Sequence, residues 1–178
     1  MNSECKQFLT MLGMDLHNPY YTHAPYLYEV CKRITQNNKR AKVLELGMGN
    51  GSSPIFAHFS REGMVVDSVE TDHTWYLQCV EKYYKGLENV NPVHHLDFKQ
   101  KYAELNNKEY DLVFVDQGSW EDRNSSLIFL LHRTKCFIAH DYDYNQSHWP
   151  ETHEMLRATF PEFTLYSELT PPTLVCEK

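Results

Sequence analysis

Three glycines at alternate positions stand directly after a short apolar segment. The segment, residues 41–46, leads into Gly47, Gly49 and Gly51, and a helix-compatible segment begins at Ser52. Glycine lets the backbone turn tightly and approach a ligand without a Cβ in the way, and the following helix presents free N–H groups. Glycine-rich turns also end strands in proteins that bind nothing, so the loop needs support from a second feature.

A carboxylate at the end of the next apolar segment supplies that support. Glu70 closes residues 65–70 and follows Gly51 by 19 residues. At this place in an α/β fold, a carboxylate is suited to bind the two hydroxyls of a ribose. A dinucleotide-dependent dehydrogenase is one alternative, but its third glycine usually comes three residues after the second, whereas Gly49 and Gly51 are two apart.

Three later apolar segments also end in residues that can carry chemistry. These are Asp97 after residues 90–96, Asp116 at the end of residues 112–116, and His140 with Asp141 after residues 136–139. Ligands of open α/β sheets bind at the carboxyl ends of the strands. We therefore expect Asp116, His140 and Asp141 near the reacting atoms, where His140 could act as a general base. A strand-end histidine satisfied by backbone contacts and a solvated Asp97 are the alternatives.

The elements that must position these residues follow from periodicity. Strands are expected at residues 41–46, 65–70, 90–96, 112–116, 136–139, 163–169 and 173–176, with helices at 52–60, 73–86, 100–107, 122–131 and 151–160. Strands separated by helices of this length predict βαβ units and a parallel sheet covered on both faces. The last two strands are divided only by Thr170-Pro171-Pro172, so we expect an antiparallel hairpin.

The expected fold class is therefore a Rossmann-like α/β three-layer sandwich with a seven-stranded, mostly parallel sheet and an antiparallel C-terminal hairpin strand. We expect a single domain in which residues 1–40 form an N-terminal helical cap and residues 41–178 form the core. The cap helices are expected at residues 4–13 and 24–37. Between them, Tyr20, Tyr21 and His23 could line a substrate pocket, which His148 and Trp149 could close from a loop on the other side.

Composition narrows the classes of partner. The 178 residues include 17 Lys+Arg against 24 Asp+Glu, a formal net charge of −7. A protein that binds by neutralising phosphates normally has a basic excess, so no nucleic-acid partner is expected. No apolar stretch approaches the roughly 18 to 20 residues that span a bilayer, so no membrane partner is expected either. The five cysteines include no C-x-x-C pair, which predicts reduced thiols in a cytoplasmic protein.

The glycine loop, Glu70 and the terminal hairpin together resemble the class I S-adenosylmethionine-dependent methyltransferases. The first motif of that family is similar to residues 45–51, its ribose-binding acid matches Glu70, and its hairpin matches residues 163–175. The resemblance implies S-adenosylmethionine as the cofactor, with Glu45 near its methionine part. The cofactor-binding residues that it implies are Glu45, Gly47, Gly49, Gly51, Glu70, Asp97, Phe98, Asp116 and Trp120. Asp97 would accept the adenine amino group while Phe98 packs on the ring.

Residues 110–123 are similar to the corresponding stretch of catechol O-methyltransferase-like enzymes. Those enzymes have an Asp at the strand end, then a Trp near the adenine and an Asp-Arg pair, which correspond here to Asp116, Trp120 and Asp122-Arg123. The lysine that serves as their base falls at Glu121 in this chain. A glutamate at that position could act as a base without being a simple substitute for lysine.

The same resemblance implies a metal site. In the catechol-type enzymes a metal is held by the Asp that ends the fourth strand and by an Asp-Asn pair that ends the fifth. Asp116 and Asp141 match two of these positions, while Tyr142 replaces the Asn. With His140 or Asp143 nearby, the two carboxylates could bind Mg²⁺ or another hard divalent ion. The missing third ligand leaves a metal-independent enzyme as the alternative.

The function implied by the resemblance is methyl transfer to a small-molecule acceptor, at oxygen rather than nitrogen. The chain lacks an Asn/Asp-Pro-Pro-Tyr/Phe motif at Asp116, which argues against an amino-methyltransferase of nucleic acids. Two alternatives stay open. One is a protein that binds S-adenosylmethionine or a nucleotide without transferring methyl groups, such as a regulatory or partner subunit, and the other is an NAD-dependent oxidoreductase. The oligomeric state is left open.

Overall fold

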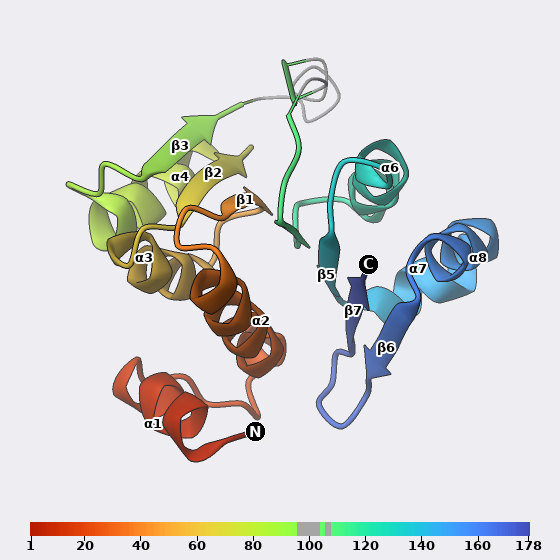
Figure 1. Cartoon of the computed structure of the whole chain (residues 1–178), viewed down its shortest axis with the longest axis horizontal. Helices are drawn as coiled ribbons and strands as arrows, with labels where there is room; N and C mark the ends of the chain where they lie inside the picture. Colours follow the sequence, from red (N-terminus) through yellow and green to blue (C-terminus); the bar gives the residue numbers. More distant parts are fainter. Residues whose placement is uncertain (96–103, 106–107) are drawn as a thin grey trace.

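The computed structural model describes residues 1–95, 104–105 and 108–178 and contains one seven-stranded sheet (Figure 1). The strand order is β3-β2-β1-β4-β5-β7-β6. The strands are β1 (Lys42–Leu46), β2 (Val65–Glu70), β3 (Val90–His94), β4 (Leu112–Val115), β5 (Cys136–His140), β6 (Glu162–Tyr166) and β7 (Thr173–Glu177). Every expected strand is present. Asp97 and Phe98 lie outside the described residues, as does most of the helix expected at 100–107.

The pairing of the strands confirms the expected sheet. Strands β1 to β5 pair with one another in parallel, whereas β7 is antiparallel to both β5 and β6. The connection between β6 and β7 is too short to cross over the sheet, because a parallel connection needs a dozen or more residues. Reversal of the order at β1 and β4 places the carboxyl ends of these two strands beside a crevice, the usual ligand site of such sheets.

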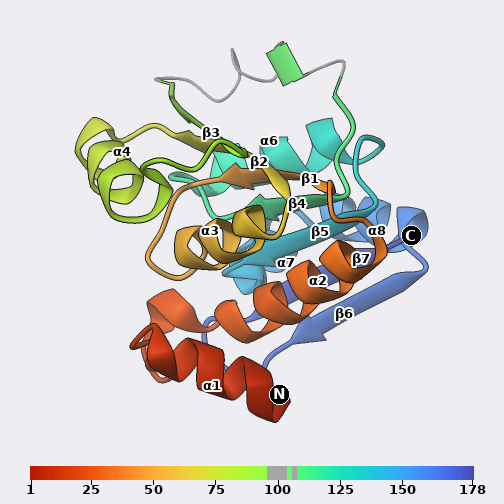
Figure 2. The same cartoon turned by 60° about the vertical axis from the view of Figure 1, so that its left-hand side comes forward.

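Helices cover both faces of the sheet (Figure 2). They are α1 (Ser3–Met11), α2 (Ala24–Asn37), α3 (Ser53–Arg61), α4 (His73–Cys79), α6 (Trp120–Leu130), α7 (Tyr142–His148) and α8 (Pro150–Thr159), with two short turns, η1 (Pro19–Tyr21) and η2 (Val80–Tyr84). None of the helices in the described part of the chain is both long and apolar enough to cross a membrane.

Alternate residues of each strand pack into two separate apolar layers, one on each face of the sheet. Val43 and Phe114 pack with α1, α2 and α3 on one face. Leu44 and Val113 pack with α6 and α8 on the other face. Successive side chains of a strand point to opposite faces, so a strand buried on both faces is apolar throughout. The two layers confirm the three-layer sandwich, and all five cysteines lie buried in these layers as free thiols.

One expected element is wrong. The segment after β5 was expected to be a loop, but residues 142–148 form helix α7, and His148 is its last residue. Asp141 makes the turn possible because its backbone lies in the left-handed region, with φ 53° and ψ 42°, so the chain passes from the strand into the helix within one residue. Aspartate tolerates this conformation better than most residues do.

Candidate active site

A cavity of about 610 Å³ opens at the carboxyl ends of β1, β4 and β5. Its walls come from the segment before α2, the glycine loop, the ends of β4 and β5, and the β6–β7 connection, with one residue each from α4 and α6. The lining residues are Pro19, Tyr20, Tyr21, His23, Met48, Gly49, Asn50, Gly51, Trp75, Asp116, Arg123, His140, Asp141 and Pro171. The volume is typical of a small-molecule site, and Tyr20, Tyr21 and His23 lie where a substrate pocket was expected.

The three glycines have different structural roles. Gly47 has φ +88°, and a Cβ there would lie 2.5 Å from the backbone oxygen of Asp116. A Cβ on Gly51 would lie 2.6 Å from the backbone oxygen of Tyr20 and 2.8 Å from the ring of His23. At Gly49 the nearest atom would be Ser52 Oγ, at 3.6 Å. Gly47 and Gly51 therefore allow close packing within the protein, whereas Gly49 keeps the cavity wall open.

Glu45 anchors the glycine loop from below. Its carboxylate is fully buried and accepts hydrogen bonds from four hydroxyls, those of Ser52 (2.7 Å), Ser53 (2.9 Å), Ser68 and Tyr84. Burial raises the pKa of Glu45 to about 7 although these donors favour the ionised form. The residue is not part of the cavity lining, so the structure gives it a positioning role under the loop rather than a direct cofactor contact.

Glu70 lies beside the loop, at the end of β2. One carboxylate oxygen accepts from the backbone N–H of Met48 at 2.9 Å, and the other accepts from those of Thr71 and Asp72 at 2.7 and 2.8 Å. Burial raises the pKa of Glu70, while the three backbone donors act in the opposite direction. Trp75, which lines the cavity, donates to the carbonyl of Met48. Glu70 therefore does not line the cavity itself but contacts Met48, which does.

The ends of β4 and β5 bring three predicted residues together. Asp116 Oδ1 lies 3.2 Å from Nδ1 of His140, and Nε2 of His140 lies 3.5 Å from Oδ1 of Asp141. Burial disfavours the charged carboxylate of Asp116, but the hydrogen bond to His140 and the charge of Arg123 outweigh this effect and lower its pKa. Asp116 is therefore ionised at neutral pH. This grouping follows from the parallel register, which aligns the two strand ends.

Arg123 joins the two carboxylates. Its NH2 group lies 3.0 Å from Asp116 Oδ1, and its NH1 group donates to Asp141 Oδ2 at 2.9 Å. Its Nε donates to the backbone oxygen of Gln117 at 2.7 Å. This bidentate arrangement uses the fork geometry of guanidinium. The sequence shows Arg123 only as part of a family motif, and nothing in the spacing indicates that it pairs with Asp141.

The position of Arg123 bears on the expected metal pair. A hard divalent ion on Asp116 and Asp141 would need the carboxylate oxygens that the buried guanidinium already contacts. Asp143, considered as a third ligand, is exposed in the first turn of α7. The arrangement of these carboxylates therefore does not fit the Mg²⁺ site that the resemblance implies, and no step is derived through such an ion.

His23 is a buried polar residue in the cavity wall. Its ring is 1% exposed and packs against Phe114 and His140, with ring centroids 4.9 and 4.4 Å away. Burial, followed by the neighbouring His140, lowers the pKa of His23 to about 3, so the imidazole is neutral. Neither ring nitrogen makes a hydrogen bond of ordinary geometry in the described structure.

The aromatic residues near α7 do not line the cavity. Trp120 lies over the guanidinium of Arg123 at 4.5 Å and stacks on Tyr144, with ring centroids 4.5 Å apart. His148 and Trp149 contact Tyr144 instead of closing the cavity. Trp120 therefore shields the Arg123 ion pairs in this structure. Its predicted place near the adenine, like the other cofactor contacts, stays a prediction.

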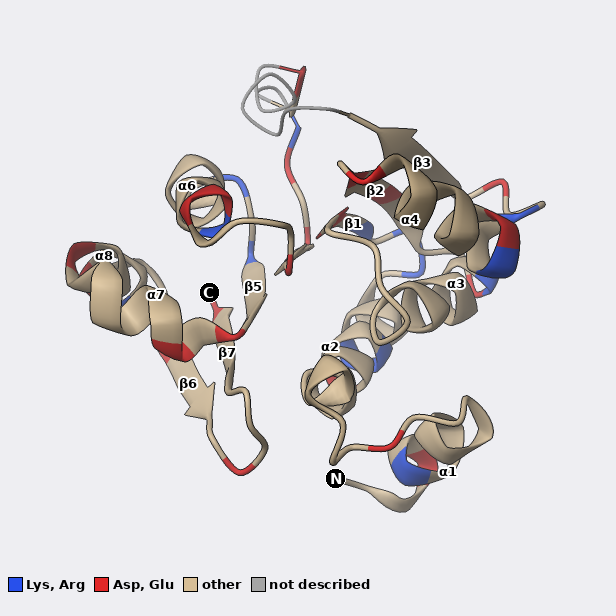
Figure 3. Ribbon diagram, turned by 180° about the vertical axis from the view of Figure 1, so that it is seen from behind, with Lys and Arg blue, Asp and Glu red and all other residues tan. Residues whose placement is uncertain are grey.

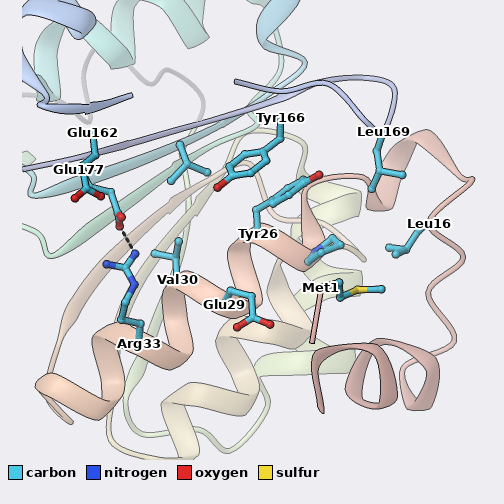
Figure 4. A pocket seen from close by; sticks show the side chains of 12 residues that line it. Met1, Leu16, Tyr26, Glu29, Val30, Arg33, Glu162, Tyr166, Leu169 and Glu177 are labelled. Atoms are coloured by element: carbon cyan, nitrogen blue, oxygen red, sulfur yellow. Dashed lines mark hydrogen bonds and ion pairs between the residues drawn. The ribbon is translucent and has the colours of Figure 1, made fainter. Parts of the chain in front are cut away.

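A second, larger cavity of about 780 Å³ lies between α2 and the β6–β7 hairpin (Figure 4). Tyr26 and Tyr166 stack in its wall, with ring centroids 4.1 Å apart, and Arg33 pairs with Glu177. None of the residues that line it also lines the cavity at the strand ends. Asp116, His140 and Asp141, which were predicted near the reacting atoms, line the smaller cavity instead.

Comparison with solved structures identifies the fold. The O-methyltransferase TomG from Streptomyces achromogenes, solved with S-adenosylmethionine, matches with a TM-score of 0.66 at 16% identity, covering 99% of this chain and 96% of that chain. An O-methyltransferase from Bacillus cereus, in complex with SAH, matches with a TM-score of 0.57 at 16% identity, covering 98% and 89%. The fold is therefore that of class I methyltransferases.

A nucleic-acid-related protein also shares the fold over a smaller part of its length. The fibrillarin pre-rRNA processing protein of Methanococcus jannaschii matches with a TM-score of 0.52 at 17% identity, covering 78% of this chain and 66% of that chain. No family model and no curated protein sequence matches this chain.

Proposed function

We propose that this protein is an S-adenosylmethionine-dependent methyltransferase that methylates an oxygen atom of a small-molecule acceptor. The observation that carries the proposal is one cavity with the glycine loop on one wall and Asp116, His140 and Asp141 on the other. The loop wall suits a cofactor, and the acidic wall suits an acceptor whose proton must leave. The fold shared with solved O-methyltransferases supports both assignments.

The cofactor would lie along the glycine loop. Gly49 leaves room for close approach of the methionine part, and the backbone of Met48 leads from there to Glu70. On binding, the carboxylate of Glu70 would exchange part of its backbone bonding for the ribose hydroxyls. Trp75 stands at the same end of the cavity and would pack against the nucleoside. The cofactor supplies a methyl group on a cationic sulfonium, which is already electrophilic.

The protein's part in the reaction is mainly positioning and proton removal. Transfer requires the acceptor oxygen, the methyl carbon and the sulfur to lie on one line, an orientation that the cavity walls would impose. The acceptor oxygen forms its bond to carbon as the carbon–sulfur bond breaks, and the hydroxyl proton passes to the Asp116–His140 pair. Asp116 and Asp141 also place negative charge near the sulfonium, and Arg123 fixes both carboxylates.

The net charge of the chain, and the share of each solved structure that it spans, favour a small acceptor over a nucleic acid. The net charge is −7, and Arg123 is the one lysine or arginine that lines the smaller cavity in the described part of the chain. Segments with lysine and arginine are spread over several elements (Figure 3), and five of these residues, Arg40, Lys42, Arg133, Lys135 and Lys178, line a different cavity. Phosphate contacts of a nucleic acid bound at the smaller cavity would need a basic excess there. The chain also spans nearly the whole of TomG, but only 66% of the fibrillarin chain.

Calorimetry tests the cofactor assignment. We expect S-adenosylmethionine and S-adenosylhomocysteine to bind, and NAD not to bind. Glu70→Gln should weaken both by about tenfold or more, because a hydrogen bond to a charged group contributes about 1.5–3 kcal/mol. Glu88→Gln, at an exposed position, is the matched control. Binding of NAD alone, or equal affinity in the Glu70 variant and its control, would contradict the assignment.

A transfer assay tests the enzymatic part. The protein is incubated with methyl-labelled S-adenosylmethionine and with sets of phenols, aliphatic alcohols and amines. Labelled methyl ethers are the expected products. Labelled amines would overturn the choice of oxygen, and tight cofactor binding without product from any set would favour a binding protein.

A further inference from the structure

We propose that His23, Asp116 and His140 bind one divalent transition-metal ion at the floor of the smaller cavity. Each of the three can offer a ligand atom, and these atoms lie within 4.8 Å of one another. The ligands come from the segment before α2, the end of β4 and the end of β5. The inference does not rest on methyl transfer, because ion binding can be measured in the protein without cofactor.

The donor set selects the kind of ion. Two imidazole nitrogens and one carboxylate suit Zn²⁺, Co²⁺ or Fe²⁺, whereas Mg²⁺ and Ca²⁺ prefer oxygen donors. Zinc–ligand distances of about 2.0–2.2 Å put adjacent ligand atoms roughly 3.4 Å apart in a tetrahedral site. Nδ1 of His140 already lies 3.2 Å from Oδ1 of Asp116. The donor set therefore differs from the pair Asp116 and Asp141 and selects a different class of ion.

The buried ring of His23 supports a ligand at this place. A buried polar atom without a partner costs about 1–3 kcal/mol, so such atoms in folded proteins need an explanation. His23 is 1% exposed and lines the cavity, and both of its ring nitrogens lack a well-formed hydrogen bond. Its neutral imidazole is the form that binds metals. A metal ion bound to one ring nitrogen of His23 would leave only the other nitrogen without a partner.

The hydrogen bonds of Thr22 agree with a metal ion on Nδ1 of His140. The Thr22 hydroxyl has one hydrogen and lies 2.9 Å from the backbone oxygen of Pro171 and 3.3 Å from that of Pro19. When it donates to either oxygen, it accepts from Nε2 of His140, also 2.9 Å away, in place of the hydrogen bond from Nδ1 to Asp116. In that tautomer, Nδ1 turns a lone pair toward Asp116 Oδ1 at 3.2 Å, beside the guanidinium of Arg123.

A metal ion on Nδ1 and Asp116 resolves that contact. Metal-binding histidines usually donate their other N–H to an oxygen acceptor, which here would be Thr22. Arg123 contacts Asp116 through Oδ1, so the ion would bind Asp116 through its other carboxylate oxygen. Asp116, Asp141 and Arg123 together carry a formal charge of −1, which favours a dication. The remaining coordination positions would face the cavity.

A cobalt titration tests the site directly. Chelator-treated protein is titrated with Co²⁺ and followed by visible absorption, and calorimetry is repeated with Zn²⁺ and Mg²⁺. We expect one Co²⁺ per chain, displacement by Zn²⁺, and no displacement by millimolar Mg²⁺. Proton NMR of the Co²⁺ form should show two strongly shifted imidazole N–H signals, one from each histidine ligand.

Variants separate this site from surface histidines. His23→Ala should lower Co²⁺ affinity at least 100-fold, and Thr22→Val should lower it about tenfold, as expected for a group that orients a ligand. His17→Ala, at an exposed position, should leave affinity unchanged. Circular dichroism checks that each variant is folded. If His23→Ala does not fold, the shifted N–H signals of the unmodified Co²⁺ form test the two histidine ligands instead.

Several results would overturn the inference. They are no absorption change up to about 100 μM Co²⁺, equal affinity in His23→Ala and His17→Ala, competition by Mg²⁺, or fewer than two shifted N–H signals. Calorimetry with S-adenosylmethionine in the presence of chelator measures cofactor binding without metal. It therefore separates failure of the metal site from failure of the proposed function.

Discussion

Replacing Arg123 with methionine should lower the free energy of unfolding by about 3 kcal/mol. The side chain is 10% exposed, and its partners Asp116 and Asp141 are 22% and 21% exposed. Removing one partner of a buried ion pair costs about 3–5 kcal/mol, whereas an exposed pair contributes about 0–1 kcal/mol. We choose the lower end of the buried range because the carboxylates keep some contact with water. For a chain of this size the change corresponds to a decrease in Tm of about 6–12 °C.

Arg123→Lys separates charge from geometry. Lysine keeps a cation near the carboxylates but cannot reproduce the hydrogen bond from Nε to the Gln117 carbonyl together with both ion pairs. We expect a loss of about 1–2 kcal/mol, in the range of one or two hydrogen bonds. A loss as large as that of Arg123→Met would show that the fork geometry, not the charge, stabilises this site.

Urea unfolding followed by circular dichroism measures these differences. Arg61→Met is the matched control, because Arg61 is exposed at the end of α3 and its side chain donates only to a backbone oxygen of its own helix among the described residues. The control should change stability by less than about 0.5 kcal/mol. If Arg123→Met is no less stable than this control, the guanidinium does not hold the two strand ends together.

Three further results are expected. Gly47→Ala should cost about 3 kcal/mol in urea unfolding, through backbone strain and the 2.5 Å approach to Asp116, whereas Gly118→Ala, with no atom near its Cβ, should be neutral. Gly49→Ala should leave unfolding unchanged but weaken S-adenosylhomocysteine binding in calorimetry, since its Cβ would enter the cavity. The pKa of Glu45 in the folded protein, about 7, exceeds the ordinary glutamate pKa of 4.5, so the neutral carboxyl contributes its full stabilisation below pH 4.5. Unfolding free energy should then fall by about 3 kcal/mol as pH rises through 7, compared with Glu45→Gln, and parallel pH profiles would contradict this.

The strands were predictable because each is a short apolar segment bounded by polar or glycine residues. The helix at 142–148 was not, since its sequence Tyr-Asp-Tyr-Asn-Gln-Ser-His has no apolar period and its start depends on the left-handed backbone of Asp141. Local patterns contain little information about such a turn. Tertiary contacts, such as the burial of Tyr142 beneath the helix, decide it instead.

The grouping of Asp116, His140 and Asp141 was predictable for a geometric reason. Parallel strands in register end at the same edge of the sheet, so residues that close neighbouring strands lie close together. The partners of these residues were not predictable. Arg123 reaches them because α6 packs against that edge, and His23 reaches His140 from more than a hundred residues away in the chain. Such contacts depend on the packing of whole elements, which spacing along a sequence does not encode.

Thr22 is buried beside the smaller cavity and connects two segments that lie far apart in the sequence. Its hydroxyl contacts His140 and the carbonyl of Pro171, while the neighbouring backbone of Tyr20 lies against Gly51. Residues before α2 and the connection between the last two strands therefore form part of the same cavity wall. Thr22 and Pro171 are 149 residues apart in the sequence, so this wall is complete only when both segments have packed against the strand ends.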